Sequence, residues 1–277
     1  MKTALIVLLC ILGILLLLFL LLPMGKRKKR GFYGLAAYDY AHRGLHDIGQ
    51  GIPENSIRAF RLAVESGYGA ELDVHLSKDG RLIVMHDESL ARTAGVDRNI
   101  ADCTAEELDA LCLQGTEEKI PYLEEILPLF EGRTPLVIEI KAFGGNHAAL
   151  TERVCALLDE FPDLKFCIES FDSRVLLWLK KHRPEIVRGQ LSENFFKDRN
   201  GLNFLTAFLL TNLWMNALTR PHFVAYKLQD RKCLGAVISR CVWGVQEFNW
   251  TLRSAREISQ VKKNGALPIF ELCRPDR

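Results

Sequence analysis

Strand-like apolar runs alternate with helix-like segments along most of this chain. Gly69–Leu76 and Pro135–Lys141 read as strands, whereas Asp172–His182 and Ala255–Lys263 have the composition and spacing of helices. Repeated strand-then-helix order is typical of a parallel sheet covered by helices. This order restricts the fold more than any other feature of the sequence.

Nine segments are predicted as strands, namely residues 36–42, 69–76, 82–85, 135–141, 165–169, 186–191, 223–228, 241–246 and 266–272. A closed barrel of eight strand and helix units needs about 250 residues. The chain of 277 residues holds one such barrel once its N-terminal segment is set aside. We therefore predict an α/β protein with a TIM (β/α)8 barrel over residues 37–277, and one of the nine strand candidates is an extra.

The N-terminal segment is predicted to be a transmembrane helix. Ala4–Leu22 is charge-free and almost wholly apolar, and its length matches the thickness of a bilayer. It is longer than the apolar core of a signal peptide, and the following Leu-Leu-Pro-Met-Gly with five cations is a poor cleavage site. The prediction is an uncleaved anchor over residues 1–25 and a basic linker over 26–36.

The sequence also predicts the orientation of this anchor. KRKKR at 26–30 follows the apolar run, whereas Lys2 and the α-amino group are the cations at its other end. Positive charge near a span marks its cytoplasmic side. We therefore expect a single-pass protein of the cell membrane with its C-terminal domain in the cytoplasm.

Composition excludes some classes of protein. The chain has 36 basic and 34 acidic residues, which argues against nucleic acid as a partner. Its eight cysteines show no Cys-x-x-Cys pair and fit a reducing compartment. A second apolar block at 200–218 contains Asn and Thr residues, so we predict a buried or membrane-contacting helix there instead of a second span.

Polar side chains collect at or near the ends of the predicted strands. Glu71 and Asp73 lie two residues apart, so a strand would place both carboxylates on one face. Glu139 and Lys141 have the same spacing on another strand. Carboxylate oxygens suit a hard divalent cation. Barrel enzymes build their sites at the C-terminal ends of their strands, where the candidate residues are His42, Glu71, Asp73, His86, Glu139 and Lys141.

An ordered set of short motifs adds a family resemblance. The motifs are AHRG at 41–44, PEN at 53–55, ELDV at 71–74, SKDG at 77–80, MHDESLART at 85–93 and IEIK at 138–141. In this order they resemble the glycerophosphodiester phosphodiesterase family, closely over residues 38–140 and loosely beyond. The resemblance implies metal-dependent hydrolysis of glycerophosphodiesters to an alcohol and glycerol 3-phosphate.

The resemblance also implies a role for each matched residue. His42 and His86 match the general acid and base, without a decision as to which is which. Glu71, Asp73 and Glu139 match the ligands of a divalent metal, Mg²⁺ or Ca²⁺. Arg43 and Lys141 match cations that contact phosphate, and Trp243 aligns with an aromatic residue beside the substrate. WGVQ at 243–246 and PIFEL at 268–272 depart from the family pattern, which affects the rim opposite the metal.

Two other functions remain open at this point. One is a lysophospholipase D-like or phospholipase-like activity on membrane lipid, favoured by the anchor and by the 204–218 block. The other is a catalytically idle, membrane-tethered module that binds phosphorylated head groups. Retention of both histidines and all three carboxylates argues against the idle module. The expected partners are a small-molecule or lipid-derived phosphodiester and the membrane.

Overall fold

The computed structural model describes residues 2–28, 32–199 and 201–275. Within these residues eight parallel strands form a closed barrel, because the pairing of β1 with β2 joins the two ends of the sheet. The barrel strands are β1 Tyr40–His42, β2 Gly69–Leu76, β4 Leu136–Ile140, β5 Phe166–Ser170, β6 Arg188–Ser192, β7 Phe223–Lys227, β8 Gln246–Leu252 and β9 Leu267–Phe270. The predicted TIM barrel is confirmed.

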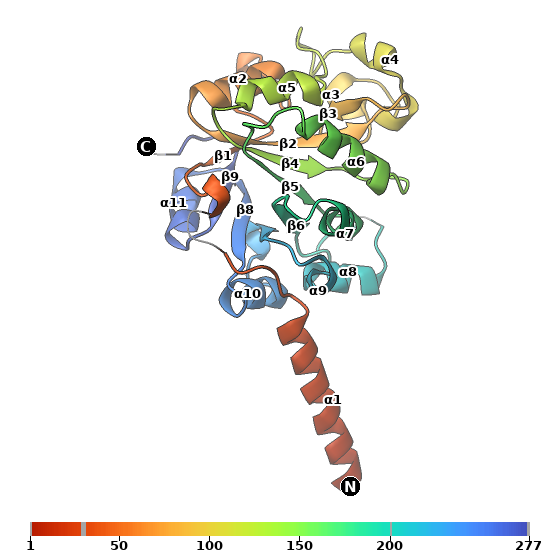
Figure 1. Ribbon diagram of the computed structural model, residues 1–277, viewed down its shortest axis with the longest axis vertical. Helices are drawn as coiled ribbons and strands as arrows, with labels where there is room; N and C mark the ends of the chain where they lie inside the picture. The colour runs from red at the N-terminus through yellow and green to blue at the C-terminus, as the bar shows by residue number, and fades with distance from the viewer. Residues whose placement is uncertain (1, 29–31, 200, 276–277) are drawn as a thin grey trace.

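Helices surround the barrel (Figure 1). The main ones are α2 Ile57–Glu65, α5 Leu123–Phe130, α6 His147–Leu158, α7 Ser173–His182, α8 Phe204–Thr211, α9 Asn216–Thr219, α10 Leu234–Cys241 and α11 Ala255–Lys263. Two short helices, α3 Ala91–Ala94 and α4 Ala105–Asp109, belong to an excursion between β3 and α5. Helix α2 shows why these segments fold as they do: Ser56 caps its N-terminus, and Phe60 and Val64 on one face are buried.

The extra strand is β3, Leu82–Val84. It pairs antiparallel with β2, with Val84 opposite Val74, and lies outside the barrel order. The turn over residues 77–80 is too short for a crossover, so it can join only antiparallel strands. Of the nine predicted strands, residues 82–85 are therefore the one that lies outside the barrel.

The predicted strand at 241–246 is wrong. Helix α10 continues to Cys241, and β8 begins only at Gln246. Between them Gly244 has a φ of 64°, and the side chains of Trp243 and Val245 pack beside Val224 and Ala236. The apolar residues of this stretch suggested a strand, but they serve to pack the loop under α10.

Large apolar side chains fill the N-terminal end of the barrel. Phe32, Tyr40, Phe223 and Phe248 are buried in one cluster. At Gly189 in β6 an added Cβ would lie 2.1 Å from the ring of Phe223, so only glycine leaves room for that ring. These side chains close one end of the barrel and leave polar residues to its other end.

The segment predicted as a basic linker is partly built into the barrel. Phe32 and Leu35 are each only 1% exposed, and the hydroxyl of Tyr40 donates to the carbonyl of Leu35. Upstream, the backbone N–H of Lys26 donates to Pro221 and that of Lys28 to Gly244. The described parts of the segment 26–36 therefore join α1 to the barrel and are attached to it by apolar side chains and backbone hydrogen bonds.

Helix α1, Lys2–Leu21, projects from the barrel beside α8, α9 and α10 (Figure 1). Among the described residues it is the one helix long and apolar enough to cross a membrane by length and composition. The predicted helical block at 200–218 divides into α8 and α9, because Leu213 between them has a φ of 58°.

Candidate active site

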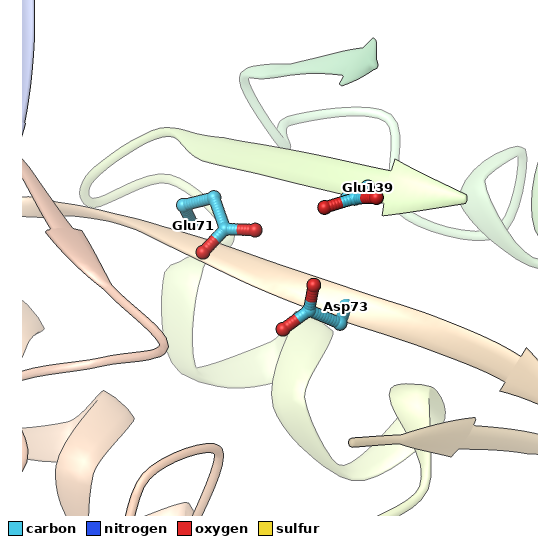
Figure 2. Close-up of side chains that lie close together, drawn as sticks. All are labelled: Glu71, Asp73 and Glu139. Carbon is cyan, nitrogen blue, oxygen red and sulfur yellow. The ribbon is translucent and has the colours of Figure 1, made fainter. Parts of the chain in front are cut away.

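Three carboxylates from two neighbouring strands converge inside the barrel (Figure 2). Glu71 and Asp73 point from the same face of β2, and Glu139 on β4 is the register partner of Asp73. One oxygen from each lies within 4.8 Å of the others, and all three residues are buried. The structure therefore brings together the three side chains predicted as metal ligands.

The charges of this cluster suit a cation. Burial, followed by the nearby carboxylates of Asp73 and Glu139, raises the pKa of Glu71 well above its usual value. Burial also raises the pKa of Glu139 to about 7, against the opposing effect of Lys141. Three carboxylates held this close in a buried place repel one another, and a hard divalent cation such as Mg²⁺ or Ca²⁺ would relieve that repulsion. The donor set therefore fits such an ion.

Lys141 and Asn55 fix Asp73 within the cluster. The Nζ of Lys141 lies 3.1 Å from Oδ1 of Asp73 and 3.0 Å from Oε2 of Glu139. The Nδ2 of Asn55 donates to Oδ2 of Asp73 at 3.1 Å. Burial would raise the pKa of Asp73, but Lys141 and other nearby positive groups outweigh burial and lower it. Asp73 therefore stays ionised and ready to bind a cation.

The position of Arg43 depends on a backbone turn at Gly44. Arg43 has a φ of 54° and Gly44 a φ of 79°. A Cβ added at Gly44 would lie 2.8 Å from the Cβ of Ala59. In this turn the backbone N–H of Arg43 donates to Oε2 of Glu71 at 3.2 Å. The guanidinium of Arg43 donates to the carboxylate of Glu54, which holds the arginine side chain in place.

Each candidate histidine has a carboxylate at Nδ1. The Nδ1 of His42 lies 2.6 Å from Oε2 of Glu271, and that of His86 lies 2.6 Å from Oδ1 of Asp87. A carboxylate acceptor at Nδ1 favours the tautomer with its proton there and leaves Nε2 to exchange protons. The Nε2 of His42 is 3.8 Å from Oε2 of Glu71, so this atom faces the carboxylate cluster.

The pKa of each histidine ring lies below its usual value. Burial lowers the pKa of His42 to about 4, despite its hydrogen bond with Glu271. Burial also lowers the pKa of His86 below its usual value. Burial alone would raise the pKa of Glu271, but hydrogen bonds with His42 and Arg253 outweigh it and lower that pKa to about 2. A neutral ring with an ionised partner can accept a proton at Nε2.

A cavity of about 880 Å³ opens over these groups. Its wall away from the carboxylates contains Phe171, Leu191 and Trp250. The rings of Phe171 and Trp250 meet edge to face at 5.8 Å, and the Nζ of Lys227 lies 5.7 Å from the Trp250 ring and 2.5 Å from Glu193. The cavity therefore has one polar, charged wall and one apolar wall with an ion pair beside it.

The structure does not bring Trp243 to this cavity. It lies before β8, at the N-terminal end of that strand, and its indole N–H donates to the carbonyl of Leu20 at 2.7 Å. Trp250, near the other end of β8, lines the cavity instead. The expectation for Trp243 rested on matching WGVQ at 243–246 with the family pattern, and Trp243 lies before β8 instead of near its C-terminal end.

Sequence reasoning missed several residues that line the cavity, among them Glu169, Trp250, Arg253 and Glu271. Glu271 directly follows β9, and Arg253 directly follows β8, so the rule that barrel sites form after strands could have identified both. Glu169 on β5 is the register partner of Glu139. Its Oε2 is buried without a hydrogen-bond partner in the described part of the chain.

Comparison with known proteins gives a consistent result. The family model described as the glycerophosphoryl diester phosphodiesterase family matches residues 42–224. A glycerophosphodiester phosphodiesterase of Caldanaerobacter subterraneus subsp. tengcongensis is 38% identical over 160 residues, which is 54% of this chain and 65% of the relative. A lysophospholipase D of Rattus norvegicus is 34% identical over 166 residues, which is 54% of this chain and 50% of the relative. These alignments thus cover less than two thirds of either relative.

A solved structure shares the fold. It is a phosphodiesterase of Oleispira antarctica in complex with the product sn-glycerol-3-phosphate, with a TM-score of 0.68 and 22% identity over 84% of this chain and 92% of the other. The family model covers more than half of the sequence and includes the histidines, the carboxylates, Arg43 and Lys141. By this match the chain belongs to the glycerophosphoryl diester phosphodiesterase family.

Proposed function

We propose that this protein hydrolyses glycerophosphodiesters to an alcohol and glycerol 3-phosphate, with a divalent cation as cofactor. The observation that carries the proposal is the cluster of Glu71, Asp73 and Glu139 beside a cavity that two carboxylate-supported histidines line. A module that only binds phosphate would need the cations alone. The acidic cluster and the paired histidines supply the groups that bond cleavage requires.

Binding of the phosphodiester falls to the positive groups of the cavity. Arg43 offers a planar guanidinium fork to phosphate oxygens, and Lys141 offers a point charge. Glu71, Asp73 and Glu139 would hold Mg²⁺ or Ca²⁺. When bound there, the ion would act as a Lewis acid on a phosphoryl oxygen and help to orient the nucleophile. The chain's own cations then hold the substrate beside both histidines.

Proton transfer falls to His42 and His86. One ring accepts a proton from the attacking water at Nε2, and the other, in the form protonated at both nitrogens, gives its Nε2 proton to the leaving alkoxide. Glu271 and Asp87 hold the Nδ1 protons and stabilise the imidazolium that forms. Burial of His42 keeps its ring neutral before the reaction, as a general base requires.

Lysophospholipids are the second candidate substrates. The apolar wall formed by Phe171, Leu191 and Trp250 could lie against an acyl chain, and one relative is named a lysophospholipase D. Helix α1 supports the proposal that the protein is anchored in the cell membrane, and the five cations at 26–30 support a barrel on the cytoplasmic side. Both observations favour a substrate derived from membrane lipid.

One assay separates these functions. Purified full-length protein in detergent is incubated with glycerophosphocholine, glycerophosphoglycerol or a lysophospholipid, with added Mg²⁺ or Ca²⁺ and with a chelator. We expect cation-dependent release of glycerol 3-phosphate from the first two. Preferential release of head group from the lysophospholipid would select the second candidate. Binding of substrate without turnover under every condition would contradict both and leave the binding module.

A further inference from the structure

Helix α8 is apolar on the side that faces away from the barrel. Its inward side buries Ala207 and Thr211, yet Phe204 and Leu205 are 63% and 65% exposed. The helix α11, by contrast, presents charged and polar residues outward and buries Ile258 and Val261. A helix that is apolar all round is typical of a buried or membrane-contacting segment. A surface of this kind on one side of a barrel indicates an interaction site.

The exposed side of α8 continues into the contact with α1. The ring of Phe19 near the end of α1 lies 5.9 Å from Phe208 of α8 and 5.1 Å from Trp214, in edge-to-face geometry. Phe208 and Trp214 also meet each other at 5.0 Å. One aromatic cluster therefore joins the C-terminal end of α1 to α8.

This contact fixes the depth of α8 relative to a bilayer. A helix of 20 residues is about 30 Å long, so α1 would use its whole length to cross the hydrocarbon core. Phe19 lies in its last turn, which places Phe19 and its neighbours at the boundary between acyl chains and head groups. The backbone bonds from Lys26 to Pro221 and from Lys28 to Gly244 hold the barrel close to this end of α1.

The apolar surface extends from α8 towards the active-site cavity. The rings of Phe196 and Phe204 lie 5.4 Å apart, and the guanidinium of Arg199 lies 5.9 Å from the Phe204 ring. The same connection begins at Glu193, which lines the cavity. Aromatic and aliphatic side chains next to an exposed arginine fit a lipid surface that carries anionic head groups.

We propose that the α8 surface, formed by Phe196, Phe204, Leu205, Phe208 and Leu209, inserts into the head-group boundary of the membrane that α1 crosses. The inference rests on the proposed crossing of the membrane by α1 and does not depend on the catalytic activity. Two attachments, α1 and the α8 surface, restrain the tilt and rotation of the barrel. The connection that starts at Glu193 then lies at the membrane, where a lipid-derived phosphodiester would be encountered.

Depth-dependent fluorescence quenching tests this placement in the full chain. The exposed and partly exposed cysteines are replaced by serine, except that Cys10 within α1 is kept in one variant as its label site. In two further variants the single label is placed at Leu205→Cys or at Ala110→Cys, an exposed residue directly after α4. Figure 1 shows α4 on the opposite side of the barrel from α1. Each protein is incorporated into phosphatidylcholine–phosphatidylglycerol nanodiscs that contain brominated lipids, with one copy per disc.

We expect the label at position 205 to lie about 5–10 Å inside the interface, the depth of interfacial helices. The Cys10 label should lie deeper, and the Ala110→Cys label should be reached by aqueous iodide alone. A quenched Cys10 label with a 205 label that only iodide reaches would overturn the α8 surface while leaving α1 in the membrane. A 205 label shielded from both quenchers would also overturn it, because a protein partner would then cover the surface. An unquenched Cys10 label would remove the premise.

Discussion

The two candidate catalytic histidines differ in their surroundings, but each has a carboxylate within hydrogen-bond distance of its Nδ1. Glu271 directly follows the last barrel strand, and Asp87 is the residue after His86 in the sequence. Each carboxylate fixes a tautomer and balances the charge of a protonated ring.

We expect His42→Ala and His86→Ala each to lower kcat by at least about a hundredfold, the usual loss for a positioned acid or base. The double variant should be little worse than the worse single one, because residues that act as a unit are not additive. Steady-state kinetics on the best glycerophosphodiester measures both effects. His182→Ala is the control, since that residue is exposed and outside the cavity. Near-normal turnover of either variant would make that histidine structural.

Glu71→Gln should be inactive whether or not a divalent cation is added. The substitution keeps the size of the side chain but deletes one of three charges that would bind the ion. Titration calorimetry should show weaker Mg²⁺ or Ca²⁺ binding, and thermal unfolding should show an intact fold. Glu152→Gln on the exposed side of α6 serves as the control. Unchanged cation affinity in Glu71→Gln would place the ion elsewhere.

Glu271→Gln should lower kcat by at least about tenfold, part of the acid–base contribution of His42. The amide retains a hydrogen bond but not the charge that stabilises the imidazolium. Glu271→Asp should restore part of the rate, which a purely steric role would not explain. Kinetics of both variants beside exposed Glu160→Gln would test this. Equal rates for Glu271→Gln and the unmodified protein would show that His42 acts without the carboxylate.

Arg92 connects the excursion between β3 and α5 with the loop that follows β1. Arg92 in α3 donates to Glu54 at 2.6 Å and to Asp87 at 2.5 Å. Glu54 also accepts from Arg43, so the link reaches the phosphate-binding side of the cavity. The excursion therefore positions Asp87 and, through it, His86.

Arg92→Met should lower Tm at neutral pH, and the loss should shrink in acid. Burial would raise the pKa of Asp87, but hydrogen bonds with Arg92 and His86 outweigh it and lower that pKa to about 2. An unfolded Asp has a pKa of about 3.9, so the pair stabilises the fold above that pH and loses this effect as pH falls towards 2. Thermal scans across this range compare the variant with Arg174→Met, whose partner Asp172 is local. A pH-independent difference in Tm would contradict the ion-pair explanation.

Sequence patterns predicted some of the strands correctly and one of them wrongly. Apolar runs and a short turn were sufficient to identify β2 and β3, but the apolar residues at 241–245 imitated a strand. Their burial comes from contacts with Val224 and Ala236. Propensity and spacing cannot distinguish a packed loop from a strand when only tertiary contacts determine the burial.

At the scale of the whole molecule, α1 is attached to the barrel through defined contacts. Trp243 donates to Leu20, and Phe19 contacts α8 and Trp214. This attachment would keep the cavity at a fixed place relative to the membrane. A flexible tether would instead allow the barrel to rotate freely.

We expect the barrel to lie on the cytoplasmic side of the membrane. Five cations follow α1 at 26–30, against Lys2 at the other end, and positive charge is retained on the cytoplasmic side. Protease added outside intact cells should leave the barrel whole, and cell lysis should expose it to cleavage. A periplasmic or secreted domain cut under the same conditions is the control. External cleavage of the barrel would reverse the predicted orientation.

The sequence by itself determined the class of fold, the apolar N-terminal helix and most of the chemical groups, because these depend on local periodicity and on spacing within single strands. The period of two placed Glu71 and Asp73 on one face before any contact was known. Only the tertiary structure determined that Glu271 supports His42 from 229 residues away, that Trp250 and not Trp243 lines the cavity, and that α8 meets the end of α1. These relations depend on closure of the barrel, which joins its last strand to its first and sets which distant side chains share a wall.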